Sequence, residues 1–430
     1  MKTVRHTDAD FEAVISTLET RGETVPEGVM ESVFEIVGEV RKRGDEAVAE
    51  YTLRFDDLDL EKAGMEIDLG ELEKALQEIP AQDREIIESA ARAIKEFHEK
   101  QVEESWIYEA SPGVKLGQKV TPIERVGLYV PGGTAAYPSS VLMNAIPARV
   151  AGVNQVIMVV PTPRGEVNQT VLAAAAICGV DRVFTLGGAQ AVAAMAYGTQ
   201  TVPRVDKIVG PGNIYVAMAK KVVFGDVDID MVAGPSEILV LADSSGDPVL
   251  IAADLLSQAE HDPLAYPIFV TDDEEMLSRT AEEIQRQLEL LPRQVIALQS
   301  LDSRGHLILA ENMEQALSVV NRIAVEHLEL MVEDPEKTLD FIKNAGAIFL
   351  GKYTAEALGD YMAGPNHVLP TGGTARFFSP LGVYDFIKRS SVIWYDKAAL
   401  EAKAGMVAQF ARLEGLEAHA RAVDLRVGKK

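Results

Sequence analysis

The strongest constraint on the fold lies in the middle of the chain, where short apolar segments, turns and helical segments alternate. RVGLYVPGG is the first apolar segment with its turn, and VNQVIMVVPTP, VDRVFTLGGAQ and VDKIVGPGN are its successors. Each is followed by an apolar helical segment, such as VNQTVLAAAAICGV. Strand, turn and helix in succession are typical of a parallel sheet that helices cover on both faces. We therefore predict an α/β domain over about residues 121–235.

A second α/β series follows and ends near residue 385. Its strand candidates are SEILVLADSS, YPIFVTDD and NAGAIFLGKY, with helical segments between them. Residues 1–105 have apolar side chains every three or four positions, which predicts charged amphipathic helices. The tail after residue 385 is predicted to be helical, and because it begins after the core is complete, we expect it to pack on a second subunit. The similar order of the two series leaves open whether they are a duplicated unit.

Charge and cysteine content argue against several classes of protein. A formal charge of -25 disfavours binding to nucleic acid or to an anionic membrane surface, since both need a basic patch. The first residues lack the apolar core of a signal peptide, and no apolar run of about 18 residues is present, so we expect a cytoplasmic protein. Cys178 is the single cysteine, which excludes an intrachain disulfide and a cysteine-based zinc site. Its apolar neighbours indicate a core residue rather than a catalytic thiol.

Three glycine-rich turns follow strand candidates and would lie at the carboxyl edge of the sheet, where α/β proteins usually bind ligands. They are Gly132-Gly133, Gly187-Gly188 and Gly210-Pro211-Gly212. None completes the G-x-G-x-x-G fingerprint of dinucleotide binding, so the glycines either only permit tight turns or help to hold a ligand. An aromatic ring and two amides flank these turns and offer contacts to an adenine or a ribose: Tyr129, Gln190 and Asn213.

Two polar side chains interrupt an apolar helical segment at SQAEHDP. Gln258 and His261 are three positions apart and therefore share one face, near the helix end that Asp262-Pro263 imposes. A metal ion could use the amide oxygen and the imidazole nitrogen, and a purely structural role for the pair remains open. Asp360 in LGDYMAGPNH and His419 in the tail segment EGLEAHA are candidates to complete a nitrogen and oxygen ligand set, which suits zinc or manganese.

Glu326 and His327 in VEHLEL are the candidates for proton transfer. A neutral imidazole, with an ordinary pKa of about 6.5, is a suitable base for an alcohol proton. Adjacent side chains point in different directions on a helix, so the two suit separate proton-transfer steps better than one dyad. The alternative is a helix cap beside a surface histidine.

Together these segments resemble the histidinol dehydrogenase family, in its order. The matching segments are RVGLYVPGGTAAYPSSVLMNAIPA, LGGAQAVAA, VGPGN, DMVAGPSE, LLSQAEHDP, EHLEL, AGPNHVLPTGGTARFFSPL and EGLEAHA. The resemblance covers essentially the whole chain, and several segments of this length make it specific. Val325 stands where the family commonly has proline before Glu-His, and we expect this difference to leave the chemistry intact.

The resemblance implies an α/β fold of two Rossmann-like parallel-sheet domains with helical N- and C-terminal extensions, assembled as an intertwined homodimer with shared active sites. It implies an N-terminal helical arm over residues 1–24, and a first Rossmann-like domain over 25–107 and 236–385 that carries the metal and catalytic residues. A second Rossmann-like domain over 108–235 would bind NAD. A helical tail over 386–430 would contact the partner subunit and place Glu414 and His419 in its active site.

The resemblance also implies a reaction, the NAD-dependent four-electron oxidation of L-histidinol to L-histidine through L-histidinaldehyde, which ends histidine biosynthesis. One zinc ion per subunit would be held by Gln258, His261, Asp360 and His419. NAD would contact Tyr129, Gln190 and Asn213, and protons would be transferred by Glu326 and His327. Contacts to the substrate would come from Ser236, Gln258, His261, His327, Asp360, His367, Glu414 and His419.

Three other functions remain as alternatives. A dehydrogenase of the same family could oxidise another alcohol, such as a sulfonated diol, although His367, Glu414 and the EGLEAHA tail favour histidinol. A metal-dependent hydrolase on an α/β scaffold would have no use for NAD. A binding protein without activity is disfavoured, because Glu326-His327 and the four metal-ligand positions are intact.

Overall fold

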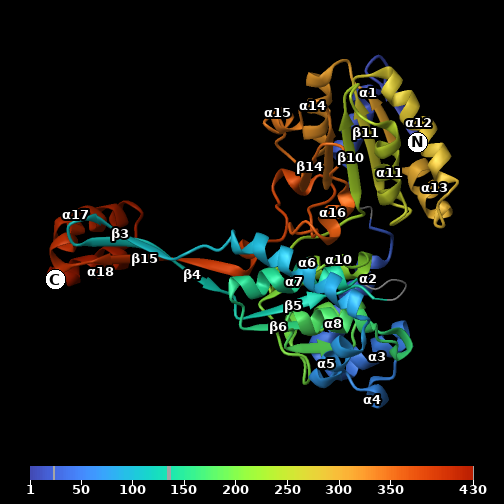
Figure 1. Ribbon diagram of the computed structural model, residues 1–430. Coiled ribbons are helices and arrows are strands. Elements are labelled where there is room, and N and C mark those ends of the chain that lie inside the picture. The colour runs from blue at the N-terminus through green and yellow to red at the C-terminus, as the bar shows by residue number, and fades with distance from the viewer. Residues whose placement is uncertain (23–24, 133–136, 430) are drawn as a thin grey trace.

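The computed structural model describes residues 1–22, 25–132 and 137–429, which form two α/β domains and a slender arm (Figure 1). We call the upper domain in Figure 1 domain I; it comprises residues 1–22 and 236–386. The lower one is domain II, with residues 25–104, 123–132 and 137–235. The arm comprises residues 105–122 and 387–429 and projects away from both domains.

Each domain is built around a six-stranded sheet. In domain I neighbouring strands are parallel throughout, in the order β1 (Lys2–Arg5), β12 (His306–Leu309), β11 (Tyr266–Thr271), β10 (Glu237–Ala242), β13 (His327–Met331), β14 (Ala347–Leu350). In domain II the order is β2 (Glu66–Ile67), β7 (Arg182–Phe184), β6 (Gln155–Val159), β5 (Arg125–Tyr129), β8 (Lys207–Val209), β9 (Asp228–Ile229). Here β2 is antiparallel to β7, and the other pairs are parallel.

The two sheets share one connectivity. Numbered from β10 in domain I and from β5 in domain II, both have the strand order 3-2-1-4-5, with a further edge strand beside strand 3. This order is that of Rossmann-like folds, so the predicted pair of Rossmann-like domains is confirmed. The order reverses between β5 and β8 and between β10 and β13. Such switch points are where open α/β sheets bind ligands.

Helices cover both faces of each sheet, so the central strands are buried on both sides, whereas the edge strands are partly exposed. Domain I has α1 (Phe11–Glu19), α11 (Pro248–Ala259), α12 (Glu274–Leu288), α13 (Gln294–Ser303), α14 (Met313–Ile323), α15 (Pro335–Leu339) and α16 (Glu356–Tyr361). Domain II has α2 (Val29–Arg43), α3 (Asp45–Asp56), α4 (Leu60–Ala63), α5 (Leu69–Glu78), α6 (Ala81–Glu99), α7 (Pro138–Ala151), α8 (Gln169–Ile177), α9 (Gly188–Tyr197) and α10 (Ile214–Val223). No helix in the described part of the chain is both long and apolar enough to cross a membrane.

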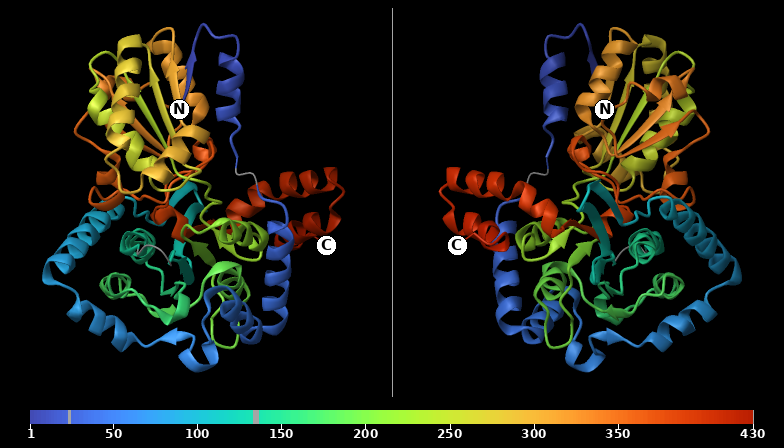
Figure 2. Two further views of the ribbon diagram at one scale, coloured as in Figure 1. Left: turned by 90° about the vertical axis from the view of Figure 1, so that its right-hand side faces the viewer. Right: turned by 90° about the vertical axis from the view of Figure 1, so that its left-hand side faces the viewer.

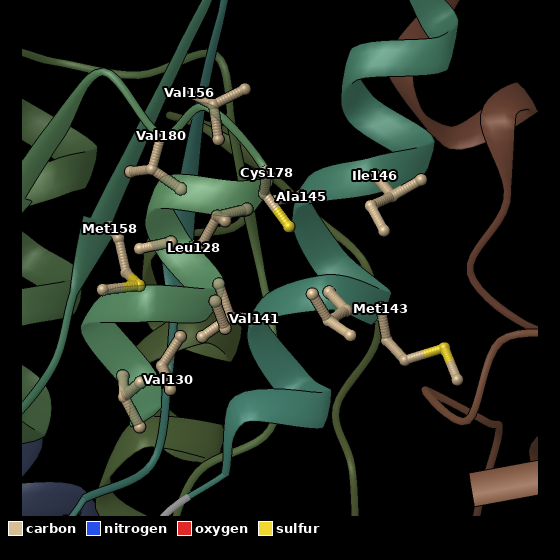
Figure 3. Packing of buried hydrophobic residues seen from close by; sticks show 14 of the residues in the cluster. Leu128, Val130, Val141, Met143, Ala145, Ile146, Val156, Met158, Cys178 and Val180 are labelled. Carbon is tan, nitrogen blue, oxygen red and sulfur yellow. The ribbon is translucent and has the colours of Figure 1, made fainter. Parts of the chain in front are cut away.

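Cys178 lies in one of the two cores of domain II, as its apolar neighbours predict. Figure 3 shows it among Leu128 and Val156 of the sheet and Ala145 and Ile146 of α7. Burial raises the pKa of the Cys178 thiol to about 12. Because a thiolate is the reactive form, this buried thiol has the environment of a core residue and not of a catalytic one.

The N-terminal region is divided between the two domains, which corrects the predicted borders. β1 pairs with β12, so the segment predicted to be a helical arm over 1–24 contributes an edge strand and α1 to domain I, with residues 23 and 24 outside the described part. The helices of residues 29–99, predicted to belong with 236–385, instead pack on domain II. Figure 2 shows α1 beside domain I and α2 beside domain II. Amphipathic spacing predicts which face of a helix is buried but not which sheet it covers.

The arm combines strands from two distant parts of the chain. Its three-stranded antiparallel sheet has the order β15 (Ile387–Tyr395), β4 (Val114–Pro122), β3 (Trp106–Ser111). The helices α17 (Lys397–Leu413) and α18 (Glu417–Arg426) follow at its tip, as predicted for the tail. The predicted border at 107/108 cuts through β3, and the strand β15 was not predicted. A hairpin that pairs with a strand some 270 positions later has no local sequence signal.

Candidate active site

The main chain of Glu237 organises a buried histidine and a buried glutamate at the amino ends of β10 and β13. Its N–H donates a hydrogen bond to Oε2 of Glu326 at 2.8 Å, and its carbonyl oxygen accepts one from Nδ1 of His327 at 2.9 Å. Only 6% of Glu326 and 5% of His327 is exposed. Because Nδ1 carries the proton, Nε2 of His327 keeps a lone pair and is able to act as a base. The helix predicted for this pair is wrong, since His327 begins β13.

The side chain of Glu237 is held in turn by Arg21. Nε and Nη2 of Arg21 donate to the two carboxylate oxygens of Glu237 at 2.7 and 2.5 Å. Nη1 of Arg21 also donates to the carbonyl oxygens of Leu18 and Ile323, and Gly372 N–H donates to Oε1 of Glu237 at 3.0 Å. Both charged side chains are almost fully buried, at 3% and 1% exposure. The pair therefore joins the N-terminal segment, β10 and the loop after His367 around the histidine.

Two carboxylates of α16 face the free nitrogen of His327. Oε1 of Glu356 is 3.8 Å from His327 Nε2, and a ligand atom of each of His327, Glu356 and Asp360 lies within 4.8 Å of the others. Within the described residues, neither His327 Nε2 nor Glu356 Oε1 has a hydrogen-bond partner. Nδ1 of His367 donates to the carbonyl oxygen of Asp360 at 3.2 Å and lies 3.8 Å from its Oδ1. Buried lone-pair atoms without hydrogen-bond partners fit a metal ion.

Gln258 and His261 are in contact, as their spacing predicts. Nε2 of Gln258 donates to Nδ1 of His261 at 3.2 Å. Gln258 is fully buried near the end of α11, and its Oε1 is without a partner among the described side chains and backbone. His261 lies close to Glu356, and the interaction with His261 lowers the pKa of the Glu356 carboxyl. Burial raises the same pKa by a larger amount. An amide oxygen and an imidazole therefore border the carboxylates of α16.

Burial controls the protonation of this centre. It raises the pKa of Glu326 well above its ordinary value, and the negative charge of Glu237 adds to the effect. Burial lowers the pKa of His327 and of His367, and the negative charge of Asp360 raises both pKa values by a smaller amount. His327 is thus neutral at physiological pH, which is the state a general base requires.

A cavity of about 580 Å³ opens at the carboxyl ends of the strands of domain II. It brings together all three residues predicted to bind NAD: Tyr129 ends β5, Gln190 lies in α9, and Asn213 caps α10. Gly188 N–H donates to the Tyr129 hydroxyl at 3.0 Å, and the Gly188 φ of 63° is accessible to glycine without strain. Gln190 is 1% exposed, and no described residue hydrogen-bonds to either of its amide atoms. A volume of this size suits a nucleotide cofactor.

The switch point of domain II locates the cavity, and the neighbouring turns shape it. Gly132 and Gly212 line the cavity, whereas Gly133 of the predicted first turn lies outside the described residues. Gly210 follows β8 with a φ of 110°, and its N–H donates to Oδ2 of Asp230 at 2.8 Å. Lys220 forms a buried ion pair with Asp230 and donates to the carbonyl oxygen of Gly210 at 2.9 Å. These bonds fix the turn between β8 and α10.

The histidine centre and the cavity belong to different domains that meet. Nδ2 of Asn366 in domain I donates to the carbonyl oxygen of Met143 in α7 at 2.6 Å. α7 follows β5 and so begins at the carboxyl edge of domain II, the edge that carries the cavity. Figure 1 shows α16 on the side of domain I that faces domain II. The site therefore combines the carboxyl edge of one sheet with the amino edge of the other.

The arm carries the two remaining predicted residues. Glu414 lies at the end of α17 and His419 in α18, both exposed. The arm projects away from the two domains, so within one chain these side chains are separated from the others (Figure 1). Ser236 directly precedes β10, beside the histidine. Glu356, Glu237 and Arg21 were not predicted, although the four-residue spacing of Glu356 and Asp360 on one helix face was a usable signal.

Two Rossmann-like domains, with a nucleotide-sized cavity on one and a buried base with carboxylates on the other, define an enzyme that brings a cofactor to an acid–base centre. The family model described as histidinol dehydrogenase matches residues 19–427. The histidinol dehydrogenase of Syntrophotalea carbinolica is 56% identical over 427 residues, which cover 99% of each chain. That of Geobacter sulfurreducens is 54% identical over 421 residues, or 98% of each.

A solved structure agrees with these relatives. The crystal structure of a histidinol dehydrogenase from Elizabethkingia anophelis matches with a TM-score of 0.93 at 36% identity, covering 99% of this chain and 98% of that one. The chain belongs to the histidinol dehydrogenase family and is an oxidoreductase.

Proposed function

We propose that this chain oxidises L-histidinol to L-histidine through L-histidinaldehyde with NAD, in the last steps of histidine biosynthesis. The observation that carries the proposal is the position of His327, whose free Nε2 lies in the domain that faces the cofactor cavity. Membership of the family supports L-histidinol as the substrate. We place the reaction in the cytoplasm.

We propose that Gln258, His261 and Asp360 hold one zinc ion together with His419 of a second subunit. The orphaned Oε1 of Gln258 and the closeness of His261 to the α16 carboxylates support this set. Glu356 is a further oxygen donor beside it. When bound, the zinc ion supplies a positive charge that fixes the substrate nitrogens and so orients the reacting carbon.

Nε2 of His327 removes the hydroxyl proton of histidinol. The Glu237 carbonyl accepts the hydrogen bond of Nδ1–H and so fixes the tautomer in which Nε2 is free. NAD, held by domain II, would supply the hydride acceptor for each of the two oxidations. Between them, Glu326 helps to activate the water that adds to the aldehyde. Glu326 and His327 are both held by the main chain of Glu237, and Oε2 of Glu326 is 3.5 Å from Nδ1 of His327, so the two groups act side by side in successive steps.

Tyr129, Gln190 and Asn213 contact NAD in this proposal. The support is their common cavity and the amide of Gln190, whose two polar atoms have no hydrogen-bond partner among the described residues. A ligand that supplied these partners would stabilise the buried amide. Ser236 and His367 contact histidinol from domain I. Glu414 of a second subunit contacts it from the arm, where a carboxylate suits the ammonium group of the substrate.

The arm supports a homodimer. It exposes large apolar side chains whose contact with water is unfavourable: Trp106, Ile107, Tyr108, Ile393, Trp394, Met406, Val407, Phe410 and Leu413. We infer that a second copy of the chain covers this surface. The same contact brings Glu414 and His419 to the partner's active site. Within one chain, these two side chains are separated from the centre in domain I.

The test is the number of NADH molecules formed for each histidine. Purified, zinc-loaded protein is incubated with L-histidinol and excess NAD, and both products are measured. Two NADH per histidine is the expected result. No NADH from folded, zinc-loaded protein would refute the proposal, and assays with other alcohols, and then of hydrolysis, would separate the alternatives.

A further inference from the structure

The cofactor cavity has a carboxylate that none of the predicted NAD contacts uses. Asp56, at the end of α3, lines the cavity close to the Gly187-Gly188 turn. Its Oδ2 is buried, and no hydrogen bond from a described residue reaches it. Burial accordingly raises the pKa of Asp56. A buried acceptor without a partner is unfavourable, so a donor from the ligand would stabilise it.

The position of Asp56 matches a known requirement of nucleotide binding. In Rossmann domains an acidic residue near the end of the second strand accepts a hydrogen bond from the ribose 2′-hydroxyl of NAD. In domain II the second strand is β6, and Pro161, not an acid, follows its end. A Cβ placed on Gly187 would lie 2.5 Å from Cβ of Pro161 and 3.4 Å from Oδ2 of Asp56. The Asp56 carboxylate therefore lies near the end of β6, although it belongs to α3 and not to the segment that follows the strand.

We propose that Asp56 binds a ribose hydroxyl of the cofactor and selects NAD over NADP. A carboxylate accepts a hydrogen bond from the 2′-hydroxyl, and its negative charge repels a phosphate at the same oxygen. This inference rests on the proposed function, in that the cavity binds NAD.

The other charges of the cavity lie nearer the solvent. Glu35 of α2 is exposed and adds negative charge. Among the described lining residues, Arg54 is the one with a positive charge, and its guanidinium lies over the Phe55 ring, 5.2 Å from the centroid. Arg54 is exposed, which suits the cofactor pyrophosphate at the mouth better than a 2′-phosphate at the end of β6.

The test measures binding rather than turnover. NAD and NADP are titrated separately by calorimetry into the zinc-loaded dimer without histidinol, for the wild type, Asp56→Asn and Asp57→Asn. Asp57 is the matched control: it is the adjacent residue, is exposed, and has a φ of 52° that asparagine tolerates. Asp56→Asn should weaken NAD binding about tenfold, leave NADP binding equal or stronger, and so reduce the preference for NAD by at least about tenfold. Asp57→Asn should change neither.

Two results would overturn the inference. One is an unchanged preference in Asp56→Asn, whether both affinities stay the same or fall equally, and the other is a wild type that binds NADP as well as NAD. If the wild type bound neither NAD nor NADP, both the proposed function and this inference would fail. If the wild type bound NAD and Asp56→Asn bound both cofactors with unchanged affinity, only this inference would be refuted. Asp56→Ser, which also removes the charge, repeats the measurement should Asp56→Asn not fold.

Discussion

His327 is held by the main chain of Glu237, whose carbonyl oxygen accepts a hydrogen bond from Nδ1 at 2.9 Å. The same residue donates its N–H to Glu326, so one peptide segment of β10 positions both groups assigned to proton transfer. The geometry of the base therefore depends on the register of β10 beside β13, in which Ile238 is paired with His327.

Removing Arg21 should destabilise the protein strongly. Arg21→Met leaves Glu237 as a buried charge without its partner, and such a loss is typically about 3–5 kcal/mol of unfolding free energy. The matched control is Arg322→Met, because Arg322 pairs with Glu12 and Glu19 at a more exposed site and should lose about 1 kcal/mol or less. Urea denaturation of both variants is the measurement. Equal losses would contradict the role assigned to the buried pair.

Substitution of His261 should remove zinc and activity together. His261→Asn retains a polar side chain but loses the imidazole, so we expect a well folded protein with little bound zinc and no NADH formation. Metal analysis by mass spectrometry and the thermal unfolding midpoint are measured alongside the rate. Full activity in a zinc-depleted His261→Asn protein would show that the metal assignment is wrong.

Substitution of His327 should separate base catalysis from metal binding. His327→Gln should lower kcat by about 10²–10⁴-fold, because a general base contributes about that much, while the zinc content stays unchanged. Nε2 of His327 is also within reach of Glu356 and Asp360 as a possible ligand atom. Loss of zinc from His327→Gln would therefore reassign the histidine from base to metal ligand.

Two inactive variants should restore activity when mixed. If each site combines His327 of one chain with His419 of the other, a heterodimer of His327→Gln and His419→Gln contains one intact site. After unfolding and refolding together, random pairing should yield about a quarter of wild-type activity. Each variant refolded alone is the control. No recovery in a mixture shown to contain heterodimers would mean that the arm does not complete the partner's site.

Acid should destabilise the protein partly through His98. Burial lowers the pKa of His98 below its ordinary value of 6.5, and its Nδ1 donates to the carbonyl oxygen of Ile94. As pH falls below 6.5, the unfolded chain binds a proton that the folded chain still excludes, so the free energy of unfolding decreases until the folded-state pKa is reached. The zinc-free His98→Leu variant should show a weaker decrease between pH 7 and pH 5. Parallel profiles for the variant and the zinc-free wild type would contradict this.

Sequence patterns predicted the parts of the site that depend on local spacing. Gln258 and His261 are in contact, although His261 lies in the turn that follows α11 and not on the helix face predicted for it. Tyr129, Gln190 and Asn213 meet because turns after parallel strands share one edge. Pairings across the chain left no local signal. Arg21 and Glu237 are 216 positions apart, and neither is unusual in its own segment.

One local pattern was misleading. The five residues of β13, His327–Met331, are all buried, yet Glu329 in their middle gives the segment the mixed polarity of a helix end. Glu329 is accommodated because its Oε1 accepts the N–H of Glu356 at 3.0 Å, a contact between β13 and the start of α16. The contact with Glu356, which is distant in sequence, allows Glu329 to be buried in a strand.

The division of the site between two sheets has a consequence for a reaction with two rounds of oxidation. Under the proposed function, every side chain that binds the intermediate aldehyde or the zinc ion belongs to domain I or to the arm of the second subunit. Every side chain assigned to the cofactor belongs to domain II. Spent NADH can then be exchanged for fresh NAD by loosening one half of the molecule, while the other half keeps the reactive aldehyde from escaping into solution.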